Sequence, residues 1–261
     1  MPRARIRCAG LAALAGVLAL GCRQAPAPAA VDPALASCLT GDTLAAAGVN
    51  LDRLRASALY SKLPAAVAAL LEPLRDASYL LLAYDGRDIL AAARGRFPEA
   101  PVGSALLGKN IAVFGSPAAL EKAKAQHRVG RTGAEWLLDR GAAVSTSPVW
   151  AVARGGVSFP LSGNAANLNR LSRLAEYETI ALQLGPAIEL EAAAVGRSPE
   201  AARNFEETLR GFFSLAAAGA GRAPDLAALL HSAQVTRDGA AVHASLSATP
   251  EQIVRVFALA E

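Results

Sequence analysis

The chain has 261 residues, 53% of them hydrophobic, and its 26 basic and 22 acidic side chains give a formal net charge of +4. Arg3, Arg5 and Arg7 lie at the extreme N-terminus, and without them 23 basic residues face 22 acidic ones. A nearly neutral body lacks the basic surface that nucleic-acid binding requires, so we expect no nucleic-acid partner. The length suits one large domain or two small ones.

The N-terminal segment has the pattern of an export signal. The three arginines precede residues 8–21, which are all apolar or glycine. This run is shorter than the roughly 20 apolar residues of a transmembrane helix, and its length and flanks are typical of a secretory signal peptide. The run closes on LALGC, from Leu18 to Cys22, which resembles the lipobox of bacterial lipoprotein precursors.

In that family the signal peptide is cleaved before the cysteine, and the cysteine is then lipidated. The resemblance implies a signal peptide over residues 1–21, lipidation of Cys22, and contact with a bacterial membrane through this lipid anchor. Residues 22–41 follow as the lipidated cysteine and a tether rich in proline and alanine. If the cell has two membranes, we expect the outer membrane, facing the periplasm, because Arg23 rather than aspartate follows the cysteine. The alternative is an ordinary signal peptide with a chance cysteine.

After export and lipidation Cys38 is the one cysteine left, because Cys8 belongs to the signal peptide and Cys22 carries lipid. A single thiol makes neither an intrachain disulfide nor a cysteine-based metal site. We expect Cys38 to be a small apolar filler of the core, with a reactive thiol or an intermolecular bridge as the alternatives.

Helix and hairpin patterns alternate through the first half of the body. Apolar spacing predicts a helix over residues 51–71 that breaks at Pro64. Two apolar runs on either side of Asp85-Gly86 predict a β-hairpin. The polar, glycine-rich residues 130–147 are expected to connect the two halves.

The second half is predicted as strand, helix, hairpin, long helix, short helix, hairpin and helix. The landmarks are, in chain order, a strand at residues 149–155, a polar stretch leading into a helix at 161–177, a hairpin at Gly185-Pro186, a long helix from Ser198, a shorter helix at 226–230, a hairpin at Asp238-Gly239 and a closing helix from Pro250.

One device for starting a helix occurs three times, as a hydroxyl residue followed by proline. The pairs are Ser116-Pro117, Ser198-Pro199 and Thr249-Pro250. The hydroxyl caps free backbone N–H groups, and proline takes the first helical position, where its missing N–H costs nothing. Gln252, three residues after Thr249, predicts a capping box.

The order of these elements predicts an α+β fold. The second half reads β-α-β-β-α-β-β-α, the first half reads like a degraded version of it, and the order resembles a ferredoxin-like layer. We therefore predict tandem ferredoxin-like units over residues 42–147 and 148–261, made of antiparallel hairpins with helices packed on one face. The body also vaguely resembles uncharacterised bacterial envelope lipoproteins.

A near-match to a phosphate-binding loop lies at residues 103–110, G-S-A-L-L-G-K-N. A working loop follows a strand, opens a helix and ends in a hydroxyl residue, whereas here Asn110 takes that place and a predicted strand, NIAVFG, follows. We expect a short helix or turn ended by Gly108, with no nucleotide and no cofactor.

Catalytic and metal-binding patterns are not found in the sequence. His127, His231 and His243 lie far apart in the chain without metal-ligand spacing, and neither a nucleophile elbow nor S-x-x-K occurs. The most unusual polar cluster contains Asn164, Asn167 and Arg170, which would lie near the start of a helix. It is predicted either to bind an anion or polar ligand or simply to cap that helix.

Strand alternation predicts a polar sheet face in the second half. Its outward side chains are Gln183, Glu189, Glu191, His243, Ser245 and Ser247. We expect this face to bind a protein partner of the cell envelope, and the leading functional prediction is a membrane-anchored, non-catalytic binding or scaffolding lipoprotein. The alternatives are an envelope hydrolase whose site assembles only in three dimensions and a small-ligand carrier that uses a cleft between the halves.

Overall fold

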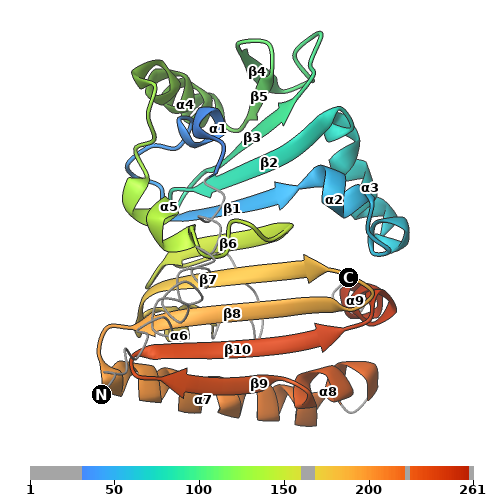
Figure 1. The fold of residues 1–261 in the computed structure, drawn as a ribbon, viewed down its shortest axis with the longest axis vertical. Coiled ribbons are helices and arrows are strands. Elements are labelled where there is room, and N and C mark those ends of the chain that lie inside the picture. The colour runs from blue at the N-terminus through green and yellow to red at the C-terminus, as the bar shows by residue number, and fades with distance from the viewer. Residues whose placement is uncertain (1–30, 160–167, 221–223, 259–261) are drawn as a thin grey trace, which may run out of the picture.

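The computed structural model describes residues 31–159, 168–220 and 224–258. The lipobox with Cys22, and also Asn164 and Asn167, lie outside these residues. At the centre is a ten-stranded sheet in the order β4-β5-β3-β2-β1-β6-β7-β8-β10-β9 (Figure 1). All the strand pairings are antiparallel. The α+β class and the antiparallel hairpins are therefore as predicted.

The bounds of the elements are as follows. The strands are β1 (Ala45–Asn50), β2 (Ala77–Tyr84), β3 (Ile89–Gly95), β4 (Ser104–Leu107), β5 (Ile111–Phe114), β6 (Val149–Arg154), β7 (Ala175–Leu184), β8 (Ile188–Gly196), β9 (Gln234–Asp238) and β10 (Ala241–Ala248). The helices are α1 (Pro33–Ala36), α2 (Leu51–Arg55), η2 (Tyr60–Lys62), α3 (Ala65–Leu71), η3 (Glu72–Leu74), α4 (Pro117–Val129), α5 (Glu135–Gly141), α6 (Leu168–Ser172), α7 (Pro199–Gly219), α8 (Pro224–His231) and α9 (Pro250–Ala258).

The two halves of the chain build the two halves of one continuous sheet. β1 and β6 pair at the centre, and outward from them the order is β2, β3, β5, β4 on one side and β7, β8, β10, β9 on the other. A ferredoxin-like unit splits its β-α-β strands around a third strand. Here β1 and β2 are direct neighbours, as are β6 and β7. Tandem ferredoxin-like units are therefore not confirmed.

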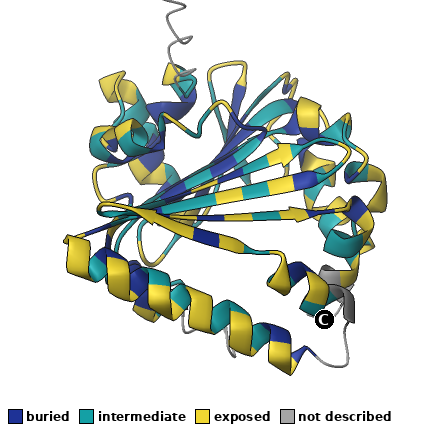
Figure 2. Cartoon of the chain, turned by 60° about the horizontal axis from the view of Figure 1, so that its bottom comes forward, coloured by how far each residue is buried: buried dark blue, intermediate teal, exposed yellow. Residues whose placement is uncertain are grey.

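Helices cover both faces of the sheet, so the prediction of helices on one face is wrong. The face that carries Ala46, Trp150 and Val152 packs against α1, α4 and α5, and we call it the α5 face. The opposite face, with Ala192 and Ala244, packs against α6 and α7 and is the α7 face. Figure 2, in which α7 is the long helix at the bottom, shows helices on both sides of the sheet.

The physical reason lies in the strands of the first half. β2 reads ASYLLLAY, and its consecutive leucines put apolar side chains on both faces. Leu81 packs with α1, α4 and α5, whereas Leu80 packs with α2 and η3 on the α7 face. A strand that is apolar on both sides must be buried on both sides, so helices are needed on each.

Several local predictions are confirmed by hydrogen bonds. Ser116 Oγ accepts from the N–H of Ala119 at 3.2 Å, and Ser198 Oγ accepts from the N–H of Ala201 at 3.1 Å. The capping box of α9 is also present, because Thr249 N–H donates to Gln252 Oε1 at 2.8 Å. The hairpins β2–β3, β7–β8 and β9–β10 form at the predicted turns.

Other local predictions need correction. The helix expected over residues 51–71 already ends at Arg55, well before the predicted break at Pro64. Residues 130–147 include helix α5, whose buried Leu137 anchors it to the core, and not only a connection. Residues 104–107 form strand β4 rather than the expected short helix or turn, and Gly108, at φ +68°, makes the turn into β5. The stretch that looks like a phosphate loop is therefore a β-hairpin, and no helix N-terminus follows its lysine.

Cys38 is fully buried among the side chains of α1, α4 and α5. Burial raises the pKa of its thiol to about 12, so the group stays protonated. The expectation of an apolar core filler is confirmed.

Candidate ligand-binding groove

A cavity of about 490 Å³ lies between the α7 face and helices α6 and α7. Phe205, Leu209 and Phe213 line it from α7, and their spacing of four residues places them on one side of that helix. The sheet contributes smaller apolar side chains, namely Ile180, Leu190, Ala192, Ala194, Val242 and Ala244. Alanines facing a helix leave space that larger side chains would fill, so the packing is open here.

A second cavity of about 270 Å³ continues under the centre of the sheet. It shares Phe159, Glu178 and Ile180 with the first cavity, so the two adjoin, and we call them together the groove. The alanines of β1 and β6 form the floor of the second cavity, with Leu82 and Ile89 beside them. Ile89 is 61% exposed and Ile180 is 40% exposed, which shows that the groove opens to solvent on this side.

Several hydrogen bonds hold the junction of the two cavities in place. The side-chain amide of Asn169 accepts from Phe159 N–H at 3.0 Å and donates to Phe159 C=O at 2.9 Å. The Phe159 ring stacks on Tyr84 with the ring centroids 5.7 Å apart. Ser172 Oγ accepts from Gly156 N–H at 3.0 Å. The wall of the groove is therefore fixed without a ligand.

Glu178 is the one acidic or basic side chain among the described residues that line the groove. It lies on β7 between Ala153 of β6 and Ala194 of β8, which face the same side. Loss of water raises the pKa of this carboxyl group, and a hydrogen bond with Ser172 opposes part of the rise. Within the described part of the chain, no basic side chain pairs with it.

The sequence contains a pattern that indicates a buried position for Glu178, although the predictions did not include it. Glu178, Ile180 and Leu182 are two residues apart, so they share one face of β7. A carboxylate in line with two large apolar residues indicates an acid on the buried side of a strand. The groove itself had no such sign, because α7 comes to β8 and β10 only through tertiary packing.

The predicted polar face is present on the α5 side of the second half. Gln183, Glu189 and Ser247 lie in one row across three strands, Glu191 and Ser245 lie in the next, and His243 follows. These side chains are exposed, and Gln183 Nε2 donates to Ser147 Oγ at 3.0 Å. The alternation is as predicted, while the binding role of the face stays a prediction. Arg170 is exposed on α6 and does not join this set, because α6 packs on the α7 face.

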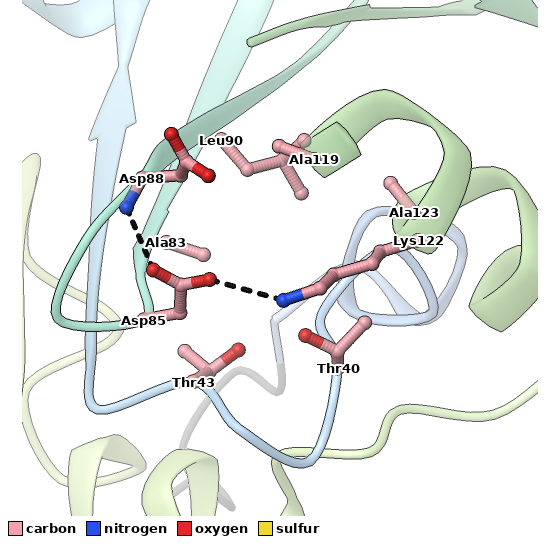
Figure 3. A pocket seen from close by; sticks show the side chains of 9 residues that line it. All are labelled: Thr40, Thr43, Ala83, Asp85, Asp88, Leu90, Ala119, Lys122 and Ala123. Carbon is pink, nitrogen blue, oxygen red and sulfur yellow. Dashed lines mark hydrogen bonds and ion pairs between the residues drawn. The ribbon is translucent and has the colours of Figure 1, made fainter. Parts of the chain in front are cut away.

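A polar pocket of about 20 Å³ lies beside the β2–β3 turn on the α5 face, and an ion-pair network crosses it. Figure 3 shows the Lys122 side chain of α4 reaching Asp85 in the β2–β3 turn. Lys122 Nζ lies 2.8 Å from Asp42 and 3.2 Å from Asp85. Asp85 also accepts from the N–H groups of Arg87 and Asp88. Lys122 pairs with both Asp42 and Asp85, and the space fits about one water, so this pocket ties a hairpin to a helix.

The histidines are distributed over separate elements. His127 lies on α4, His231 on α8 and His243 on β10. His127 Nδ1 is 2.7 Å from Ser37 Oγ, and His231 Nδ1 is 2.8 Å from the carbonyl of Ala227. In the described ranges, no group of three or more His, Cys, Asp or Glu side chains is placed to hold a metal ion. The same ranges contain no helix that is long and apolar enough to cross a bilayer.

The fold is similar to that of solved structures titled TP0453. Crystal form III of TP0453 matches with a TM-score of 0.53 at 12% sequence identity, over 88% of this chain and 98% of that chain. Crystal form IV matches with a TM-score of 0.50 at 11% identity, over 88% and 97% of the two chains. Identity this low shows likeness of fold alone. No protein-family model and no curated protein matches the chain.

Proposed function

We propose that this chain is a membrane-anchored, non-catalytic lipoprotein of the cell envelope that carries a small, mostly apolar molecule in the groove. The observation that carries the proposal is the groove, whose main cavity of about 490 Å³ is walled by alanine, leucine and phenylalanine side chains. Pockets for small molecules are typically ~300–1,000 Å³, apolar and supplied with a few polar groups. The lipid anchor rests on the lipobox from Leu18 to Cys22.

The composition of the groove argues for carriage over hydrolysis. Its described lining contains Ser172 and Glu178 but no histidine or lysine that would activate a nucleophile. Ser172 Oγ already accepts a hydrogen bond from Gly156 N–H, and its hydroxyl bonds to Glu178. These groups support binding of a polar end.

A second candidate function uses the exposed polar face. Glu189, Glu191 and His243 lie exposed on adjacent strands, and no helix of the described residues packs over them, which suits contact with an envelope protein. The two functions use opposite faces of the sheet, so a carrier could deliver its cargo while bound to such a partner.

The groove can be tested by filling it. Ala192 lies between Ile180 and Ala244 on the α7 face, and Ala192→Leu places a larger side chain in the cavity. The mature chain with Cys22→Ser, which removes the lipid, would be titrated with the neutral fluorescent probe N-phenyl-1-naphthylamine. We expect Ala192→Leu to weaken probe binding by about tenfold, equivalent to ~1.4 kcal/mol.

The matched control is Ser245→Leu, which adds a leucine to the neighbouring strand on the opposite face. We expect this variant to bind the probe as the parent does. Equal affinity of all three proteins, or no saturable binding by the parent, would contradict the proposed groove. Mass spectrometry of small molecules that co-purify with the parent chain would identify the natural cargo.

The anchor needs a separate test. Cys22→Ala should move the protein from the membrane to the soluble envelope fraction, because the lipid attachment site is gone. A variant that still sediments with membranes after a high-salt wash would show that the lipobox reading is wrong.

A further inference from the structure

We infer that Glu178 anchors the head group of the cargo by accepting its hydrogen bond, so that the groove selects long-chain alcohols and amines over long-chain acids. The inference rests on the proposed function and adds the class of ligand. It follows from the position of Glu178, from the side chains around it, and from the small number of hydrogen-bond donors that reach its carboxylate oxygens.

Glu178 lies where the two cavities meet. It lines both the cavity of about 490 Å³ under α7 and that of about 270 Å³ under β1 and β6. Apolar walls extend from it in both directions, with Phe213 in the first cavity and Ile89 in the second. A ligand with one polar end and an apolar chain can therefore place that end at Glu178 and the chain along either arm.

The oxygens of Glu178 have spare capacity to accept hydrogen bonds. Ser172 Oγ accepts from Gly156 N–H, which leaves its own proton for the carboxylate. An ionised carboxylate offers about four acceptor positions, and even a protonated one keeps acceptor capacity. Among the described residues no further donor reaches Glu178. Since partial loss of water makes an underpaired carboxylate unfavourable, a ligand that donates a hydrogen bond is stabilised here.

The same geometry disfavours an acid. An ionised head group would bring a second negative charge beside a half-buried carboxylate that no described cation neutralises, and like charges in a partly desolvated site repel. The neighbouring side chains cannot offset that charge, because Ala153 and Ala194 flank Glu178 and Phe159 lines both cavities with it. Hydroxyl and ammonium groups both donate, so both fit.

The pH profile separates the two head groups. An ammonium group pairs best with the ionised carboxylate, so amine affinity should fall as the pH drops through the pKa of Glu178, which burial raises. Alcohol affinity should change little. The other ionisable groups near this wall are Tyr84, which lines the second cavity, and Glu206 with Arg210 on α7. Arg210 bonds to Glu206 and to the carbonyl of Val235, away from the groove lining.

The experiment is a competition in which dodecanol, dodecylamine and dodecanoic acid displace N-phenyl-1-naphthylamine from the Cys22→Ser chain at pH 8. The three share one chain length, so only the head group differs. We expect the alcohol and the amine each to bind with an affinity at least about tenfold higher than that of the acid. Relative to each variant's own probe affinity, Glu178→Leu should lose this ranking and Glu178→Gln should lose the preference for the amine. The exposed Glu207→Gln of α7 should behave as the parent.

The outcomes separate the two proposals. If the acid binds as tightly as the alcohol, or if Glu178→Leu keeps the parent ranking, the anchor inference is wrong while the groove stands. If the parent binds neither the probe nor any competitor, the proposed carrier function is wrong, and the inference that Glu178 holds the head group is wrong with it.

Discussion

Gly48 is a position at which a single added methyl group should strongly destabilise the fold. It lies in β1 between Leu81 of β2 and Trp150 of β6, at the seam of the two halves. Trp150 is 1% exposed, and its indole N–H donates to Tyr79 Oη at 2.7 Å. A Cβ on Gly48 would lie well under 3.0 Å from both of these bonded atoms. The hydrogen bond therefore passes directly over Gly48, in space that only glycine leaves open.

The cost of Gly48→Ala has two parts. Overpacking a tight core costs about 1–3 kcal/mol. Separating Trp150 from Tyr79 leaves a buried N–H unpaired, which costs a further ~1–3 kcal/mol. Replacing glycine in a strand recovers about 0.5–1 kcal/mol through the unfolded chain. We expect a net loss of roughly 1–5 kcal/mol, a large share of the ~5–15 kcal/mol that stabilises a typical domain.

Urea unfolding of the Cys22→Ser chain would measure this loss, with tryptophan fluorescence and circular dichroism as two probes. Gly211→Ala is the control, because a methyl group there meets nothing within 4 Å on the exposed side of α7. It should stabilise the protein by about 0.5–1 kcal/mol. A double-mutant cycle adds Tyr79→Phe, which removes the hydroxyl oxygen that the new methyl group would clash with.

The double variant Gly48→Ala/Tyr79→Phe should then be less destabilised than the sum of the single variants, with a coupling of about 0.5–3 kcal/mol. A Gly48→Ala midpoint equal to that of the parent would refute the reasoning. Strict additivity in the cycle would show that the methyl group acts elsewhere.

Two further predictions concern ionisable groups. In the mature chain, which lacks residues 1–21 and so Cys8, Cys22→Ser leaves Cys38 as the one thiol. Native protein at pH 8 should not react with a disulfide thiol reagent, because burial raises the pKa of Cys38 to about 12, whereas unfolding in urea should expose one reactive thiol per chain. Rapid labelling of the native state would contradict this prediction. The N–H of Asp88, with smaller contributions from Arg87 and Lys122, lowers the pKa of Asp85 below its usual value. The stabilisation from the lowered pKa is present above the unfolded-state pKa of ~3.9 and is lost as the pH falls through the lower folded-state pKa. The Tm of Asp85→Asn should therefore lie below that of the parent by the full amount at pH 7 and by less toward pH 3. A difference in Tm that does not change with pH would contradict this direction.

Much of the local structure could be predicted from the sequence because it depends on neighbouring residues. The turn at Asp85-Gly86 needs a residue with positive φ, and Gly86 has φ +95°. The Ser198 and Thr249 caps depend on hydroxyl and amide groups within three residues of the helix start. The polar face with Glu189 and Glu191 follows from the two-residue period of a strand.

Other features depend on distances that no local pattern encodes. Nothing within residues 45–50 or 149–154 indicates that β1 and β6 pair and join the halves into one sheet. Helix α5 was missed because it is short and follows a stretch of glycines, and packing of Leu137 in the core supports it. The ferredoxin-like prediction inferred which strands are neighbours from the order of the elements along the chain. That order is compatible with several strand arrangements in a sheet, so it does not determine which strands pair.

The sequence by itself determined the hairpins, the helix starts, the polar sheet face and the resemblance of Leu18–Cys22 to a lipobox, because each is encoded within a few consecutive residues. Only the tertiary structure decided that α7 lies across alanines of β8 and β10, that an apolar groove remains between them, and that Glu178 faces into it. The reason is physical: a cavity is the volume that side chains from distant segments fail to fill, and that volume exists only after those segments have packed.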